Sequence, residues 1–336
     1  MHWKDIDDGA WEGITVTLTA DDVPRRPAWN IDVVRPGRVR ITAGDRARWW
    51  GRVEPGWAGL VLLRGEPMTH DDAVVRPITA DDLQSVSAAP GTVAWWRHWS
   101  RWFIEEMAAS GRSPLRPGLW WVVPTHARDV ASLTVVGERR ARDAASSRWE
   151  AARPVIARAE SEAWLEDLYE ESARLNGADA VLPMRRASPP ESSRVKMWRK
   201  RAREGTLPPV LVTDVAALTL FALLDGHDRY VAARAEGVPV PWLHVSALKF
   251  WPVRIDEKKR DALVAQAERM SAMTPAVPTG SINELYRMAF DDRPWPSRAC
   301  YGRVLPGGAR TWDEEVTRRL SQLGLSSEAR WLLAPG

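Results

Sequence analysis

The strongest constraint on this chain is an apolar run that ends abruptly in charged residues. Residues 218–224, LTLFALL, are long and apolar enough for a buried strand, and residues 225–229, DGHDR, follow without a break. Residues 229–237, RYVAARAEG, predict a helix that ends at Gly237. We therefore expect the turn 225–229 at the carboxyl end of a strand and the amino end of a helix, where unpaired backbone N–H groups attract anions.

The side chains of this turn suit a bound phosphate. Gly226 can adopt backbone angles that are closed to other residues, and Arg229 can hold phosphate oxygens in a bidentate manner. His227 would face the anion, and Asp225 or Asp228 could hold a magnesium ion, orient the histidine or accept a proton. The same residues also suit a plain turn, because Asp is a common N-cap and Asp-Gly a common turn signal. Spacing alone leaves both interpretations open.

The composition is that of a globular protein, since 45% of the 336 residues are hydrophobic and 27% are charged. No run approaches the roughly 18 apolar residues of a membrane span. The N-terminal MHWKDIDDGAWEG lacks the basic-then-apolar order of a signal peptide, so we expect a cytoplasmic protein that does not contact a membrane. The single cysteine, Cys300, excludes an internal disulfide and a Cys-rich zinc site, and the histidines show no ligand spacing.

Two biases in the composition bear on possible partners. The pI near 9.2 and the preference for Arg over Lys are compatible with DNA binding. Tryptophan is abundant, with 20 residues, and several recur at helical spacing in VAWWRHWSRWFIEEM. One face of that helix would carry Trp95, Trp99, Trp102 and Phe103. We interpret this stripe as core or interface rather than as a base-stacking platform, although Arg97 and Arg101 beside it suit the platform.

The pattern of expected elements divides the chain into four segments and predicts an α/β (α+β) fold. Residues 1–140 combine alternating strand-like runs with the tryptophan-rich helix at 92–109, which indicates an N-terminal α/β region. Residues 141–177 predict a helical connector. Residues 178–250 alternate strands and helices and predict a compact domain with a small mixed sheet, whereas residues 251–336 predict a helical C-terminal region.

A longer pattern around the turn resembles the ParB/sulfiredoxin superfamily. LPPVLV followed by LLDGHDRYVAARAEGVPVPWLHV is similar to that family's strand, its D-G-H-x-R or G-E-R-R box, its Ala-rich helix, its glycine and its Val-Pro strand. The similarity extends back through SSRVKMWRKRAREG to ADAVLPM and covers residues 178–250. The resemblance implies a ParB/sulfiredoxin-like domain in a bacterial type of protein.

The resemblance also implies a ligand, because family members bind CTP, ATP or ADP at this turn. Gly226 and Arg229 would contact the nucleotide phosphates, while Asp225 and His227 would lie near the reacting phosphoryl group. Sulfiredoxin chemistry is not expected, because its reactive cysteine aligns with His227. The partitioning proteins prefer G-E-R-R, so the box is most similar to that of the free serine kinases. Mg²⁺-dependent hydrolysis of the nucleotide or phosphoryl transfer is the implied reaction.

The remaining site residues expected from this resemblance lie around the box. Asp225 would hold the Mg²⁺, and Asp228, at the variable place of the box, would border the phosphates. In the serine kinases an acid outside the turn serves as the base, for which Glu191 is the nearest candidate. The basic helix RVKMWRKRAREG would border the pocket, and its Arg194 would meet a phosphate.

Two rival functions remain open at this point. The first is a DNA-binding or DNA-processing protein of the ParB-like nuclease type with a nucleotide switch, since the basic helix also suits a nucleic-acid backbone. The second is a non-catalytic interaction protein that docks a partner through tryptophan-rich surfaces.

Two weaker motifs are read as coincidental. LTVVGERRARDAAS at 133–146 contains a second G-E-R-R box, but no Val-Pro strand follows it. Residues 311–333 faintly resemble a helix-turn-helix, yet an ordinary pair of C-terminal helices explains them as well.

Overall fold

The computed structural model describes most of the chain in two compact units. The described residues are 1–7, 10–24, 27–34, 37–53, 60–66, 68–69, 72–124, 134–135, 168–171, 180–218, 220–251, 256–272, 279–290, 295–328 and 332–333. The first unit comprises residues 1–247 and 299–336, and the second comprises residues 248–298. The described elements form two mixed sheets and several helices. The expected α+β fold class is therefore confirmed.

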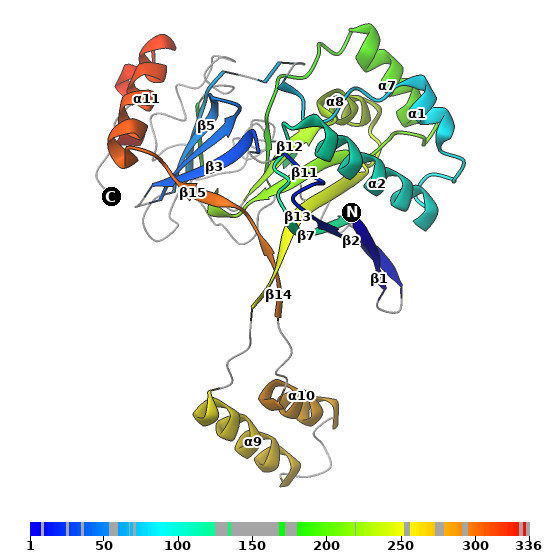
Figure 1. The fold of residues 1–336 in the computed structure, drawn as a ribbon, viewed down its shortest axis with the longest axis vertical. Helices are drawn as coiled ribbons and strands as arrows, with labels where there is room; N and C mark the ends of the chain where they lie inside the picture. The colour runs from blue at the N-terminus through cyan, green and yellow to red at the C-terminus, as the bar shows by residue number, and fades with distance from the viewer. Residues whose placement is uncertain are drawn as a thin grey trace. The chain divides into compact units, whose positions relative to one another are not determined.

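The larger sheet carries the turn 225–229. Its strands are, in spatial order, β1 (His2–Asp7), β2 (Trp11–Leu18), β7 (Gly118–Pro124), β13 (Trp242–Trp251), β11 (Val210–Val215), β12 (Leu220–Asp225), β10 (Ala180–Pro183) and β8 (Thr134–Val135), and β14 (Trp295–Ala299) also pairs with β13. Within this order β13 is parallel to β11, and β10 is parallel to both of its neighbours, β12 and β8. The other neighbours β1–β2, β2–β7, β7–β13 and β11–β12 are antiparallel (Figure 1).

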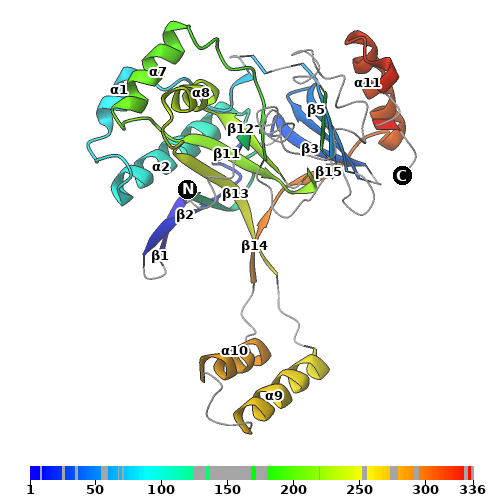
Figure 2. The ribbon, with the colours of Figure 1, turned by 180° about the vertical axis from the view of Figure 1, so that it is seen from behind.

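Both faces of this sheet are covered, which explains why its central strands are continuously apolar. Along β12, Phe221 and Leu223 pack with helices α7 (Ser193–Arg203) and α8 (His227–Glu236). The alternate residues Leu220, Ala222 and Leu224 belong to the main core together with α2 (Val93–Ser110). Helices therefore lie on opposite faces of the sheet, as Figures 1 and 2 show from two sides.

The smaller sheet has the order β15 (Gly302–Val304), β3 (Trp29–Val34), β4 (Arg38–Ala43), β5 (Arg46–Val53), β6 (Leu60–Arg64) and β9 (Leu168–Glu171). One of its faces joins the main core, and helix α11 (Gly308–Gln322) packs on the other through Trp312, Val316 and Leu320. Asp32 of β3 is fully buried and forms ion pairs with Arg40 of β4 and Arg303 of β15. A buried carboxylate needs such partners, and the pair between Asp32 and Arg303 helps to attach β15 to β3.

The second unit contains α9 (Glu257–Ala272) and α10 (Thr279–Phe290), which pack against each other. Three short elements of the first unit complete the description: α1 (Ala80–Ser85), η4 (Ala216–Leu218) and η5 (Ser326–Glu328). No helix in the described part of the chain is long and apolar enough to cross a membrane.

The helix expected over the tryptophan-rich segment is confirmed as α2, and so is its interpretation as core. Trp95, Trp99 and Phe103 are buried, and Trp102 is partly buried against the same cluster. The helix begins at an N-cap, Thr92, and ends at Gly111, which has a left-handed backbone. Bases could not stack on rings that are already covered by the protein.

Other expectations from the sequence fare differently. Within the predicted connector 141–177, residues 168–171 form strand β9 rather than helix, because they pair with β6; the rest of that segment lies outside the described residues. The C-terminal region also contains the strands β14 and β15, which the sequence did not predict. The expected boundary between residues 1–140 and 178–250 stays a prediction, although β1, β2 and β7 share one sheet with β10–β13.

The two weaker motifs can be placed only in part. Residues 134–135 form β8, but residues 136–146, which hold the second G-E-R-R box, lie outside the described residues. In the other motif α11 is followed by the 3₁₀ turn η5, and the apolar side of α11 packs on the smaller sheet. That packing is typical of a structural C-terminal helix.

Candidate functional site

The candidate site lies at one edge of the larger sheet, where two parallel strands end together. β10 and β12 are parallel neighbours, so Pro183 and Asp225 lie at the same edge. β10 leads into the loop before α7, and β12 leads directly into α8. In α/β sheets this edge, next to the amino end of a helix, is where ligands commonly bind.

Gly226 makes the sharp turn from β12 into α8 possible. Its φ of +95° lies in the left-handed region, and a Cβ at this position would approach Arg229 Nη2 to 2.9 Å and Val210 Cα to 3.1 Å. Only glycine fits both the backbone angle and the close packing. Gly226 is the N-cap of α8, and no side chain forms a capping hydrogen bond to this helix. The amino end of α8 is therefore left to other acceptors.

Arg229 is used inside the turn. It is 2% exposed, and its Nη2 donates to Asp225 Oδ2 at 2.7 Å and to the carbonyl of Pro209 at 2.9 Å. Its guanidinium also lies over the rings of Phe103 and Trp198, 5.9 and 5.6 Å from their centroids. In this conformation Arg229 pairs with Asp225 and holds the turn against β11, although its buried Nε–H has no acceptor among the described residues, so Arg229 does not extend freely toward a phosphate as the sequence suggested.

His227 is the most unusual group of the site. Its side chain is 2% exposed, and its Nε2 accepts a hydrogen bond of 3.1 Å from the backbone N–H of Arg185. Burial lowers the pKa of His227 well below its usual range, and the positive charges of Arg185, Arg229 and Arg64 lower it further. The imidazole is therefore neutral, and because Nε2 accepts, the proton resides on Nδ1. Among the described residues this Nδ1–H has no acceptor.

Asp228 anchors the loop that covers this histidine. Its carboxylate is 1% exposed and accepts 2.8 Å and 3.4 Å hydrogen bonds from the Ser188 amide and from Arg185 Nη1. Arg194 Nε lies 2.9 Å away as an ion pair, without the alignment of a hydrogen bond. Burial raises the pKa of Asp228, but the hydrogen bond from Ser188 and the charge of Arg185 outweigh it, so the net pKa is lowered. An ionised, saturated carboxylate suits a structural anchor better than direct contact with phosphate.

The other predicted residues take up different positions. Glu191 is exposed and precedes the N-cap Ser192 of α7, and among the described residues no hydrogen bond or ion pair joins it to the turn. Arg194, in the first turn of α7, is 35% exposed and reaches the site through Asp228. No group of three His, Cys, Asp or Glu side chains that could hold a metal ion exists within the described ranges. The predicted Mg²⁺ ligand, Asp225, is paired with Arg229.

The sequence did not predict the contribution of the smaller sheet to this site. Arg64, at the end of β6, stacks on Trp49 at 4.7 Å, and Trp49 Nε1 donates to the carbonyl of Pro183 at the end of β10. The amide of Met68 likewise donates to the carbonyl of Met184 at 3.0 Å. These contacts bring the charge of Arg64 near His227. Residues so far apart in sequence carry no local signal of such proximity.

The basic helix α7 is largely neutralised on the side that faces α8. Arg199 and Arg203 both pair with Glu236 of α8, and Arg194 pairs with Asp228. Lys196 and Lys200 remain exposed. This helix therefore presents fewer available cations to a nucleic-acid backbone than its sequence suggests.

No family model, no curated protein and no solved structure matches this chain. The similarity to the ParB/sulfiredoxin superfamily therefore rests on the residues quoted above, and functional arguments must come from the site itself.

Proposed function

We propose that the turn Asp225–Arg229, together with the loop before α7, binds the phosphate groups of a nucleotide: CTP, ATP or ADP with Mg²⁺. The observation that carries this proposal is the buried Nδ1–H of His227, which has no acceptor in the described part of the chain. A buried N–H without a partner costs about 1–3 kcal/mol, so an acceptor oxygen is expected there. A phosphate oxygen at the amino end of α8 would supply one.

The local charges support an anion in preference to a neutral ligand. Arg185 and Arg194 share one carboxylate, Asp228, and Arg229 is paired with Asp225. These three arginines and two aspartates leave an excess of one positive charge (3 − 2) beside the uncapped helix end. The helix dipole adds to that potential, and charge-assisted hydrogen bonds from Arg185 or Arg194 would strengthen binding.

The reaction that we propose is hydrolysis of the bound nucleotide or transfer of its phosphoryl group. His227 would donate Nδ1–H to a phosphate oxygen without carrying a charge, since its pKa is lowered well below neutrality. Mg²⁺ would arrive with the phosphates, as it commonly does when a protein supplies only one or two carboxylates. Asp225 would serve as that ligand after releasing Arg229, and Glu191, which is exposed, would act as the base.

Access to His227 requires a change in the covering loop. The Arg185 amide holds His227 Nε2, and the Ser188 amide holds Asp228, so the loop lies over the buried imidazole. A phosphate can reach Nδ1 only when these residues shift. Binding that waits for such a rearrangement has an association rate below the usual range for a preformed site.

Calorimetry and thermal shift with CTP, ATP and ADP, each with and without Mg²⁺, test the proposal. The wild-type protein should bind at least one of them, and His227→Ala should weaken that binding about tenfold or more, because a charge-assisted bond is lost. Lys196→Ala provides the control, since Lys196 is exposed on α7 and should not alter binding.

A wild-type protein that binds none of these nucleotides would refute the proposal. A strongly salt-dependent shift of duplex DNA in such a protein would instead favour a DNA-processing function. If His227→Ala and wild type bind a nucleotide equally well, the binding site lies elsewhere in the chain.

A further inference from the structure

A small pocket lies away from the turn, in the first unit. Its lining includes Trp29 of β3, Arg116 and Trp120 at the start of β7, Asp214 of β11, and Cys300 and Tyr301 before β15. The turn residue Gly226 packs on Val210 at the opposite end of β11. Asp214 is four residues farther along that strand, or about 13 Å at the rise of an extended chain. The pocket is therefore a separate candidate site.

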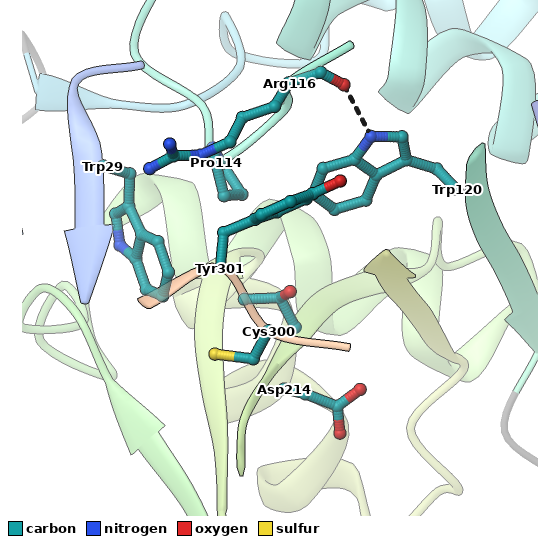
Figure 3. A pocket seen from close by; sticks show the side chains of 8 residues that line it. Trp29, Pro114, Arg116, Trp120, Asp214, Cys300 and Tyr301 are labelled. Carbon is teal, nitrogen blue, oxygen red and sulfur yellow. Dashed lines mark hydrogen bonds between the residues drawn. The ribbon is translucent and has the colours of Figure 1, made fainter. Parts of the chain in front are cut away.

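Arg116 is the cation of this pocket. Its Nη2 donates to Asn30 Oδ1 at 3.0 Å, and its guanidinium lies 5.3 Å from the centroid of the Tyr301 ring. Figure 3 shows the guanidinium beside Trp29 and above Tyr301. No carboxylate pairs with Arg116 among the residues that the structure describes, and its buried Nε–H has no acceptor there. A partly buried guanidinium without a counter-charge favours binding of an anion.

Among the described residues, neither Cys300 nor Asp214 of the lining forms an ion pair with Arg116. Burial raises the pKa of the Cys300 thiol to about 11, helped by the negative charge of Asp214, so the thiol is neutral. Asp214 Oδ2 lies 2.8 Å from His244 Nε2 and pairs with that histidine. In Figure 3 both Cys300 and Asp214 lie on the opposite side of the Tyr301 ring from Arg116. Within the described ranges, the Nε–H of Arg116 is therefore left for a ligand or for water.

We propose that this pocket binds the carboxylate group of a small organic acid, with its oxygens on the guanidinium of Arg116. A planar carboxylate matches the planar donor fork of arginine. The pocket space of about 20 Å³ admits one or two water-sized groups, such as the two oxygens of a carboxylate, and it is open on one side, so the rest of the acid would extend outward. A phosphate is larger and carries about two negative charges, so Asp214 in the same lining would repel it more strongly than it repels a singly charged carboxylate.

Fluorine NMR of trifluoroacetate tests this site directly in the full-length protein. Wild-type protein should broaden the trifluoroacetate signal at millimolar concentration, acetate should reverse the broadening, and inorganic phosphate should not. Arg116→Met keeps much of the side-chain length without the charge and should weaken binding about tenfold or more. Arg112→Met, an exposed residue of the same connection, is the matched control and should bind like wild type.

A second measurement keeps the proposal testable if Arg116→Met fails to fold. The indole N–H signal of Trp29, assigned from its absence in Trp29→Phe, should shift in the wild-type protein as acetate is added. An indole signal that does not move, together with unbroadened trifluoroacetate, means that water alone satisfies Arg116 and overturns the proposal. If phosphate reverses the broadening as effectively as acetate does, the assignment of the pocket to carboxylates is overturned.

Discussion

At position 226 the backbone and the packing both require glycine. The φ of +95° is strained for other residues, and an added Cβ would lie 2.9 Å from Arg229 Nη2 and 3.1 Å from Val210 Cα. We expect Gly226→Ala to lower the free energy of unfolding by about 2–3 kcal/mol, because it adds a steric clash to the backbone strain. Urea denaturation measures this difference.

Comparison of Gly226→Ala with Gly237→Ala separates the cost of the steric clash from the cost of the backbone strain. Gly237 also has a left-handed backbone, with a φ of +66°, but nothing lies within 4 Å of an added Cβ. Its replacement should cost only about 1 kcal/mol, the strain term alone. Equal losses for the two variants would show that the approach of Arg229 and Val210 does not limit position 226.

The titration of His227 gives the stability of the protein a predictable pH dependence. Its pKa is lowered in the folded state by burial and by neighbouring arginines, whereas the unfolded value is about 6.5. Below that pH the unfolded chain binds a proton that the folded protein excludes, so stability falls as the pH decreases from 7 to 5. His227→Gln should flatten this part of the pH profile of the free energy of unfolding.

His98→Gln is the comparison for that measurement. Burial also lowers the pKa of His98, but Asp82 and Glu105 partly oppose the shift and its side chain is only half-buried. Its replacement should flatten the profile less than His227→Gln does. An unchanged slope in His227→Gln would contradict the assignment of His227 as a buried neutral imidazole.

Among the elements, α2 shows how a tryptophan-rich helix can serve the core. Trp99 is 1% exposed and contacts Trp95, Trp102 and Phe103 through edge-on or tilted rings. We expect Trp99→Ala to reduce the free energy of unfolding by about 3–5 kcal/mol, since a large cavity would remain. Trp96→Ala, at a half-buried position on the same helix, should cost clearly less in the same denaturation experiment. Similar costs would mean that α2 contributes little through its buried face.

For the whole molecule, the division into two units predicts partial independence. The second unit, residues 248–298, is a compact group of its own, and β13 and β14, which flank its helices, pair with each other. Replacing residues 252–294 with a short glycine-rich turn should therefore leave a folded first unit, because the chain ends to be joined are neighbours. Circular dichroism should show a cooperative thermal transition within a few degrees of that of the full-length protein. Loss of cooperativity would show that the first unit depends on the inserted helices.

Much of the fold was predictable because its signals are local. The continuous apolar run before Asp225, the basic segment RVKMWRKRAREG and the terminal Gly237 mark β12, α7 and α8 without reference to the rest of the chain. The strand Leu168–Glu171 was missed because its sequence, LYEE, suits a helix as well, and only pairing with β6 makes it a strand. The pairing partners lie more than a hundred residues apart, and periodicity cannot indicate them.

By itself the sequence determined that a strand, a sharp glycine turn and a helix succeed one another at residues 220–236, and that α2 carries an apolar stripe. Backbone sterics and hydrophobic spacing act over a few residues and can be read directly. Only the tertiary structure decided that Arg229 binds Asp225 within the turn, that Asp228 anchors the loop at Ser188, and that His227 is buried with no acceptor for Nδ1–H in the described part of the chain. Burial and pairing depend on which distant segments meet, and they decide the charge and the hydrogen bonds of every side chain at the site.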